Sequence, residues 1–185
     1  LRVAVWHEHQ KGRKMLSIRK SIIITLSILV ALQVTPTLSN GLTKKEVSES
    51  YNKQVECLAK NIYYESGSEP YEGKLAVAQV TLNRVNSGKF PSDICSVVYQ
   101  KTVDQNLRTV CQFSWTCMVK ELVVRDKYAW EESMMIAKRA LTEPVLHDKI
   151  AESNAMYFHA TYIKTDWNRN KVVKQIGNHI FYSRI

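Results

Sequence analysis

The sequence predicts an α+β domain that is mainly helical and ends in a small C-terminal β-sheet. Apolar residues recur at helical spacing between residues 50 and 85 and again between residues 126 and 141. The segments 155–163 and 172–182 are instead rich in aromatic and β-branched residues, which favour strands. The chain has 185 residues and no internal repeat, so we expect one domain with extensions.

The N-terminal part has the pattern of an export signal. Met15 opens the segment MLSIRKSIIITLSILVALQVTPTLS, in which a basic flank precedes an uncharged apolar run and small residues precede a candidate cleavage point after Ser39. We interpret residues 15–39 as a signal peptide, with an uncleaved signal anchor or a core helix as alternatives. Residues 1–14 are interpreted as an upstream or non-native extension. We therefore expect an exported protein that is periplasmic, associated with the cell wall or secreted, or membrane-tethered if the signal stays uncleaved.

Removal of residues 1–39 lowers the net charge from +9 to +4, because residues 40–185 hold 20 Lys and Arg against 16 Asp and Glu. This part has no arginine-rich stripe of the kind that binds nucleic acid, and a mild positive charge suits an anionic cell wall. We expect a monomer with no nucleic-acid partner, which meets the membrane only through its N-terminal segment.

The first elements follow from local patterns. Residues 40–50 are polar and predict a linker or the frayed start of a helix, and the spacing over residues 50–64 predicts a helix. The Gly-Ser-Glu-Pro stretch at residues 67–70 breaks that helix. A second helix over residues 72–85 has apolar residues around most of its circumference, and Gly88 supplies its stop.

The remaining elements are shorter. Ser92 is a candidate N-cap of a short helix, and residues 101–120 predict an irregular or β-containing lobe. Asp126 is predicted to cap a further amphipathic helix. Gly177 and Asn178 are available for a turn within the C-terminal sheet.

The four cysteines are Cys57, Cys95, Cys111 and Cys117. An even number in an exported chain favours two disulfides, whose pairing has three possible arrangements. A zinc site is the alternative, but the five residues between Cys111 and Cys117 exceed the usual spacing of a zinc knuckle.

The stretch NIYYESGSEP holds two glutamates, Glu65 and Glu69, on either side of a Gly-Ser pair. Cleavage of a glycosidic bond needs a proton donor at the leaving oxygen, and a carboxylic acid can serve if its surroundings raise its pKa. Glu65 follows Tyr63 and Tyr64 at the end of an apolar helix, and such surroundings disfavour the carboxylate. Alternatively both glutamates are ordinary charges at a helix junction, and spacing alone does not separate the two interpretations.

Several motifs in order carry a family resemblance. NIYYESGSEPYEGKLAVAQVTLNRV is followed by FPSDICSVVYQ, CQFSWTC, YFHA and IGNHIFY. From about Cys57 to Tyr182, the chain resembles the SleB/CwlJ cell wall hydrolases, which are the spore cortex-lytic enzymes and their bacterial and phage relatives. The resemblance implies a lysozyme- or lytic-transglycosylase-like catalytic domain over residues 51–185, with peptidoglycan as its substrate.

The resemblance also implies roles for the two glutamates. In the family's tyrosine-x-glutamate-alanine-arginine-glycine-glutamate motif, the first glutamate is the catalytic acid and falls on Glu65, whereas the second falls on Glu69. The related lytic transglycosylases protonate the oxygen between N-acetylmuramic acid and N-acetylglucosamine, and the muramic C6 hydroxyl then closes a 1,6-anhydro ring. This route needs no second catalytic carboxylate. The chain departs from the family at Ser66-Gly67-Ser68, where an arginine is customary, and at Met118-Val119, where relatives often have aspartate-glycine.

The expected substrate-binding residues are polar or aromatic positions in or near these motifs. They are Glu69, Asn83, Gln112, Phe113, Ser114, His159 and Trp167. Asn83 could equally be a solvent-facing amide, and Phe113 could equally belong to the core. We expect no metal and no cofactor, because His159 and His179 would need a third ligand to hold zinc, and His179 is better explained as a core histidine.

Three functional alternatives stay open. The same fold could be a hydrolytic muramidase or glucosaminidase, which releases reducing ends in place of anhydro ends. It could be a peptidoglycan-binding protein without activity, as the altered Ser66-Gly67-Ser68 loop suggests. A cysteine peptidase with a Cys–His pair is a third possibility, although disulfides would remove its nucleophile.

Overall fold

The computed structural model describes residues 41, 43–119, 121, 123–143, 154–167 and 171–183. These residues belong, apart from Gly41, to the second of two compact units, which begins at Leu42. The predicted signal segment and the extension before it lie outside the described residues. None of the helices in the described part is long and apolar enough to cross a membrane.

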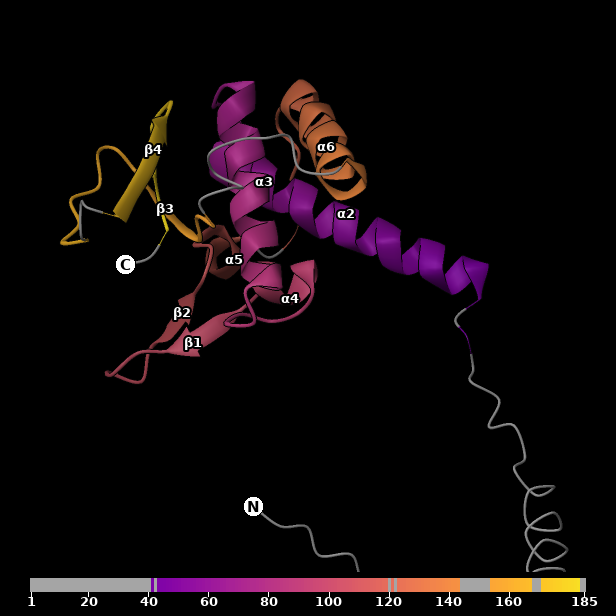
Figure 1. Cartoon of the computed structure of the whole chain (residues 1–185), viewed down its shortest axis with the longest axis horizontal. Helices are drawn as coiled ribbons and strands as arrows, with labels where there is room; N and C mark the ends of the chain where they lie inside the picture. Colours follow the sequence, from indigo (N-terminus) through magenta and orange to yellow (C-terminus); the bar gives the residue numbers. More distant parts are fainter. Residues whose placement is uncertain are drawn as a thin grey trace, which may run out of the picture. The chain divides into compact units, whose positions relative to one another are not determined.

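Helices are the main secondary structure of the described unit (Figure 1). They are α2 (Lys44–Ser66), α3 (Tyr71–Asn86), α4 (Ile94–Val98), α5 (Trp115–Met118) and α6 (Lys127–Thr142). The fold class is therefore the mainly helical one that the sequence predicts.

Helix α2 begins earlier than the periodicity indicates. Thr43 caps it through a capping box, in which Glu46 N donates to Thr43 Oγ1 (3.3 Å) and Thr43 N donates to Glu46 Oε2 (2.7 Å). Residues 44–50, predicted as a linker or a frayed helix start, are thus helical although exposed. At the other end α2 stops at Ser66, and Pro70 is the N-cap of α3, so the predicted break is confirmed.

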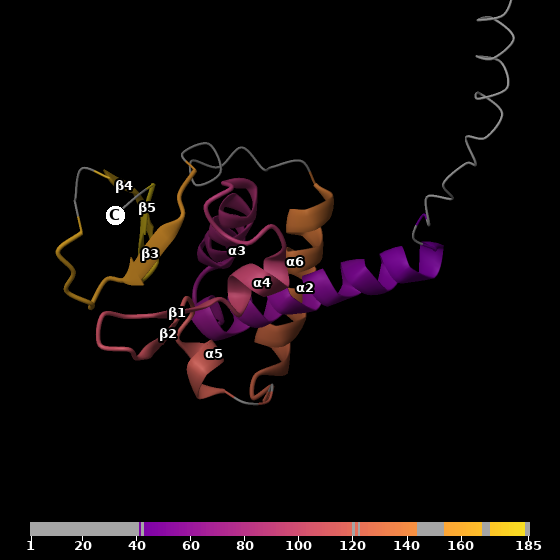
Figure 2. The same cartoon turned by 90° about the horizontal axis from the view of Figure 1, so that it is seen from below.

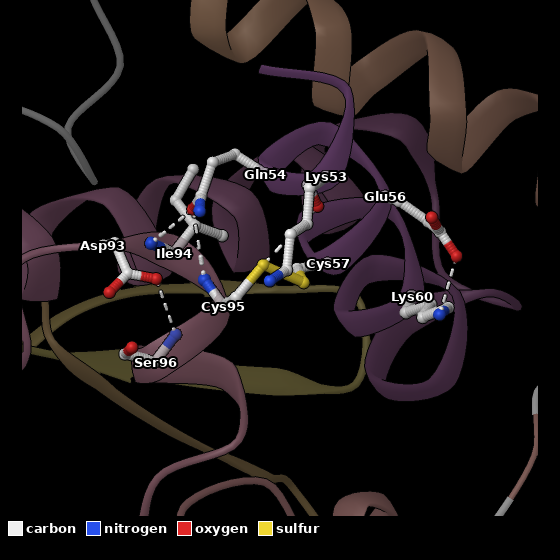
Figure 3. The surroundings of a disulfide bond; sticks show 9 residues. All are labelled: Lys53, Gln54, Glu56, Cys57, Lys60, Asp93, Ile94, Cys95 and Ser96. Carbon is white, nitrogen blue, oxygen red and sulfur yellow. Dashed lines mark hydrogen bonds and ion pairs between the residues drawn. A yellow bond between two sulfur atoms is a disulfide. The ribbon is translucent and has the colours of Figure 1, made fainter. Parts of the chain in front are cut away.

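Helix α4 is attached to α2 by covalent and polar contacts (Figure 3). Cys57 forms a disulfide with Cys95, and the Gln54 side chain accepts hydrogen bonds from the backbone N–H groups of Ile94 (2.8 Å) and Cys95 (3.2 Å). The predicted cap at Ser92 is wrong by one residue. Asp93 caps α4, because its carboxylate is the group that reaches a backbone N–H of the first turn.

The strands form two antiparallel sheets. A two-stranded sheet pairs β1 (Lys101–Val103) with β2 (Thr109–Cys111) in the lobe that was predicted to be irregular or to contain β-structure. The C-terminal sheet has the order β3-β5-β4, with bounds Tyr157–Ala160, His179–Tyr182 and Val172–Ile176. The predicted turn at Gly177 and Asn178 joins β4 to β5.

Helix α3 is buried between two apolar clusters, as its sequence predicts. One cluster gathers residues of α2, α4 and α6, with Leu58 and Ile136 fully buried. The other packs Val77 and Val80 of α3 against Phe181 and Ile176 of the C-terminal sheet. In both views α3 lies between that sheet and α6 (Figures 1 and 2). The segment with both glutamates is therefore held where the helices meet the sheet.

Candidate active site

Glu65 lies in the last turn of α2, next to the loop that leads to α3. Its side chain is part-buried, and the loss of hydration in this packed setting raises the pKa of Glu65 to about 7, against an opposing effect of the positive charge of Arg84. A carboxyl group with such a pKa is protonated in about half of the molecules at neutral pH. This is the property expected of a proton donor.

The two tyrosines before Glu65 fix the end of α2 to the segment that precedes α6. The Tyr63 hydroxyl accepts hydrogen bonds from the backbone N–H groups of Arg125 (3.0 Å) and Asp126 (3.1 Å). The Tyr64 hydroxyl accepts one from the same segment, at 3.1 Å. The two tyrosines that precede Glu65 therefore also anchor the helix that carries it.

A buried polar network joins α2 to α3. Asn61, one turn before Glu65, donates from Nδ2 to Thr81 Oγ1 (3.1 Å), and Asn61 Oδ1 accepts from Trp115 Nε1 (3.0 Å). Thr81 lies one turn before Arg84 on α3. These hydrogen bonds lie inside the protein, where a polar group without a partner costs more free energy than it does in water. They therefore fix the two helix faces against each other.

Arg84 is a buried cation in a cage of aromatic rings. Only 5% of it is exposed, and its Nε donates to the backbone oxygen of Met156 at 2.7 Å. The guanidinium lies 4.9 Å from the ring centroid of Phe113, 5.1 Å from that of Phe90 and 5.7 Å from that of Tyr157. Burial lowers the pKa of Arg84 to about 10, which leaves it charged at neutral pH. Its Nη1 has no hydrogen-bond partner among the described residues.

Glu69 connects the α2–α3 junction to the C-terminal sheet. Its Oε2 accepts from Asn178 N (2.8 Å) and its Oε1 accepts from Asn178 Nδ2 (3.0 Å). Burial opposes ionisation of Glu69, but these bonds and the charge of His179 together hold its pKa below the usual range. The two glutamates thus have opposite tendencies, since Glu65 favours the protonated form and Glu69 the carboxylate.

A pocket of about 920 Å³ opens beside the loop between the two glutamates. Tyr63, Tyr64, Gly67 and Ser68 form one wall, and Met118-Val119 is part of another. The two places where the chain departs from its family pattern therefore meet at one pocket. Glu65 is adjacent to this pocket in sequence but is not one of its lining residues.

His159 and Trp167 lie together on the face of the C-terminal sheet that carries Tyr182. His159 Nδ1 lies 2.9 Å from the backbone oxygen of Ala160, which can only accept, so Nδ1 carries the proton and Nε2 accepts from the Tyr182 hydroxyl (3.0 Å). Trp167 packs edge-on against His159, at 5.3 Å between ring centroids. All three residues line a pocket of about 590 Å³, so the structure brings together two of the predicted binding residues.

The other predicted binding residues have different surroundings. Asn83 is buried and donates to the backbone oxygen of Ala155 (2.9 Å), and Phe113 is buried beneath Arg84. The sequence left open whether Phe113 binds substrate or belongs to the core, and its burial places it in the core. Gln112 is part-buried and Ser114 is exposed, so both present surface that a ligand could contact.

Three residues of the site escaped prediction from the sequence: Arg84, Tyr157 and Asn178. Arg84 had a detectable signal, because it is a charge in a helix predicted to be buried on most sides. A charge in such a place is costly and calls for a specific partner or a function. Tyr157 and Asn178 had no such signal, since aromatic residues in strands and asparagines in turns are common.

All four cysteines are bonded. Cys57 pairs with Cys95 and Cys111 pairs with Cys117, which selects one of the three pairings left open. A cysteine nucleophile is therefore absent from the structure, and the peptidase alternative loses its reacting group. Among the described residues no group of three histidine, cysteine or carboxylate side chains is placed to hold a metal ion.

The family model described as cell wall hydrolase matches residues 68–182, more than half of the chain. The chain belongs to the cell wall hydrolase family. This confirms the resemblance found in the sequence motifs. Glu69 falls inside the matched segment and Glu65 just before it.

Individual relatives agree with the family. The chain is similar to the spore cortex-lytic enzyme of Oceanobacillus iheyensis, with 29% identity over 147 residues that cover 77% of this chain and 46% of that protein. It is similar to the spore cortex-lytic enzyme of Bacillus subtilis, with 28% identity over 131 residues that cover 70% and 37%. The chain thus spans less than half the length of these relatives. Among solved structures, the catalytic domain of the Bacillus cereus SleB protein has a TM-score of 0.49 at 23% identity, over 80% of this chain and 97% of that chain.

Proposed function

We propose that this protein is an exported enzyme that cleaves peptidoglycan glycan strands between N-acetylmuramic acid and N-acetylglucosamine, with Glu65 as general acid and then general base. Membership of the cell wall hydrolase family supports the substrate. One observation above all supports the residue, namely a part-buried carboxyl group with a pKa of about 7 at the end of α2. Two disulfides are consistent with an oxidising compartment outside the cytoplasm.

The chemistry needs one group that gives and then takes a proton. Glu65 donates its proton to the glycosidic oxygen as the bond from C1 of the muramic residue breaks, and the bonding electron pair stays on that oxygen. The resulting carboxylate removes the proton from the muramic C6 hydroxyl, which attacks C1 and closes the 1,6-anhydro ring. A pKa near 7 suits both halves of this cycle, because neither protonation state is costly at neutral pH.

The state of Glu69 supports a mechanism with a single catalytic carboxylate. Both of its oxygens accept hydrogen bonds from Asn178, and its pKa lies below the usual range. Such a group is a poor second proton donor, and the bonds to Asn178 also weaken its oxygens as a nucleophile or base. Because the substrate supplies its own nucleophile in the transglycosylase route, a second carboxylate is not required.

The variant Glu65→Gln tests the proposal. It keeps the shape and removes the acid, so release of muropeptides from purified sacculi should fall by at least about a hundredfold. The matched control is Glu49→Gln, which removes an exposed carboxylate from the same helix and should leave the rate unchanged. Undiminished activity of the Glu65 variant would refute its assignment as the acid.

Mass spectrometry of the products decides between the near alternatives. Anhydro-muramic ends support the transglycosylase, whereas reducing ends, heavier by one water, would establish a hydrolytic muramidase or glucosaminidase. Binding to sacculi without any release of fragments by the wild type would instead establish a peptidoglycan-binding protein.

A further inference from the structure

Arg84 has a position that structural stability does not explain. A guanidinium removed from water loses several kcal/mol of hydration unless charges and acceptors replace it. The three rings around Arg84 offset part of this loss through cation–π contacts, and Met156 supplies one acceptor. The Nη1 atom, however, is buried with no partner among the described residues. A buried donor left unsatisfied destabilises the folded state.

Another buried cation on the same helix is neutralised in the ordinary way. Lys74 is 6% exposed and forms an ion pair with Glu132 of α6. The fold therefore supplies a direct carboxylate partner to one buried cation of α3 and leaves a donor of the other unused. An unused donor on a fixed cation is what a site needs if negative charge develops beside it only during the reaction.

We propose that Arg84 is a positioning residue for the general acid, and that its caged guanidinium stabilises the carboxylate that Glu65 becomes after it gives up its proton. This inference rests on the proposed role of Glu65. The aromatic cage and the bond from Nε to Met156 keep the guanidinium in place, and Nη1 is left without a hydrogen-bond partner among the described residues. The charges of the two residues act on each other across the α2–α3 contact that Asn61 and Thr81 fix.

The physical effect is an electrostatic one that changes during the reaction. Before proton transfer Glu65 is neutral and gains little from a neighbouring cation. When its proton moves to the glycosidic oxygen, a full negative charge appears in a part-buried site, where a fixed cation stabilises it without reorganisation. Arg84 should therefore lower the barrier to proton donation and hold the pKa of Glu65 below the value that burial alone would give.

A pair of variants separates charge from packing. Arg84→Gln keeps an amide that can donate to Met156 and removes the charge, whereas Arg84→Lys keeps the charge. Activity of a general acid falls as pH rises through its pKa, so the alkaline limb of the kcat/KM profile should shift upward by about one pH unit or more in Arg84→Gln. The limb should stay near its wild-type position in Arg84→Lys. We also expect kcat to fall at least about tenfold in Arg84→Gln.

The control is Lys74→Gln, which removes the other buried cation of α3. This variant should leave the alkaline limb of the kcat/KM profile at its wild-type position. Equal losses of rate in both Arg84 variants with an unmoved limb would show that Arg84 serves packing alone, and would overturn the proposal.

A second measurement does not depend on a folded Arg84 variant or on activity. In the wild-type protein, the ¹³C resonance of the Glu65 carboxyl and the ¹⁵N resonances of the Arg84 guanidinium should titrate with the same midpoint. The Arg84 transition should vanish in Glu65→Gln. Arg84 resonances that stay flat through the titration of Glu65 would refute the coupling even if Glu65 is the acid. An active Glu65→Gln enzyme would refute the proposed function instead, so the two failures are distinguishable.

Discussion

Glu69 and Asn178 are 109 residues apart in the sequence, and both carboxylate oxygens of Glu69 accept hydrogen bonds from Asn178. One bond comes from the backbone N–H and the other from the side-chain amide, so the turn between β4 and β5 is held in position and in orientation. This contact fixes the C-terminal sheet to the loop that follows Glu65.

The variant Glu69→Gln should destabilise the fold by about 1–3 kcal/mol, because one oxygen that accepts is replaced by an NH₂ group that faces a donor. Urea unfolding at neutral pH measures the loss, and Glu49→Gln on the exposed face of α2 should cost no more than about 0.5 kcal/mol. The pKa of Glu69 is lower in the folded state, so its contribution is present at neutral pH and is lost as pH falls through that lowered value. A difference between wild type and variant that persists in acid would contradict this account.

Gly177 should tolerate no side chain, for two separate reasons. Its φ of +52° is a left-handed conformation, and an added Cβ would collide with Glu69 Oε2. Gly88 has a φ of +68° with open space around it, so Gly88→Ala measures the backbone cost alone, about 1 kcal/mol. We expect Gly177→Ala to cost at least about 2 kcal/mol more in thermal or urea unfolding. In a Glu69→Ala background this excess should shrink, and equal costs at the two glycines would disprove the collision.

The two disulfides should contribute unequally to stability. Cys57 and Cys95 are 38 residues apart, whereas Cys111 and Cys117 are 6 apart. Since a longer closed loop removes more entropy from the unfolded chain, replacement of the first pair by alanine should cost about 4 kcal/mol and of the second about 2 kcal/mol. Unfolding of both double variants under non-reducing conditions tests this order. A larger loss from the shorter loop would show that strain or residual structure dominates.

Glu65→Gln should stabilise the folded protein in alkali and not in acid. The folded-state pKa of Glu65 is raised to about 7, so the folded state binds a proton that the unfolded chain has already released. Stability therefore falls as pH rises from the ordinary glutamate range to about 7, and the cost is complete above that pH. At about pH 8 the variant should be more stable than the wild type by roughly 1–3 kcal/mol, and at about pH 4 the two should be equal. An equal stability at both pH values would mean that Glu65 is not desolvated.

Local patterns predicted most of the fold. The break between α2 and α3, the buried character of α3, the cap at Asp126 and the turn at Gly177 all depend on residues within a few positions of each other. The cap of α4 was misplaced from Asp93 to Ser92, because both residues are good caps and only the backbone geometry selects one.

The sequence by itself determined the family, most of the helical and strand segments and, through the family motif, the candidate acid, because these depend on motifs and on short-range periodicity. Only the tertiary structure decided which cysteines pair, that Phe113 lies in the core, and that Arg84 is a buried cation whose charge acts on the pKa of Glu65. It also separated the two glutamates, since Glu69 is held as a carboxylate by a residue at the other end of the domain and Glu65 is left desolvated near a buried charge. The pKa of a carboxyl group depends on burial and on charges across space, and neighbours in sequence do not specify those.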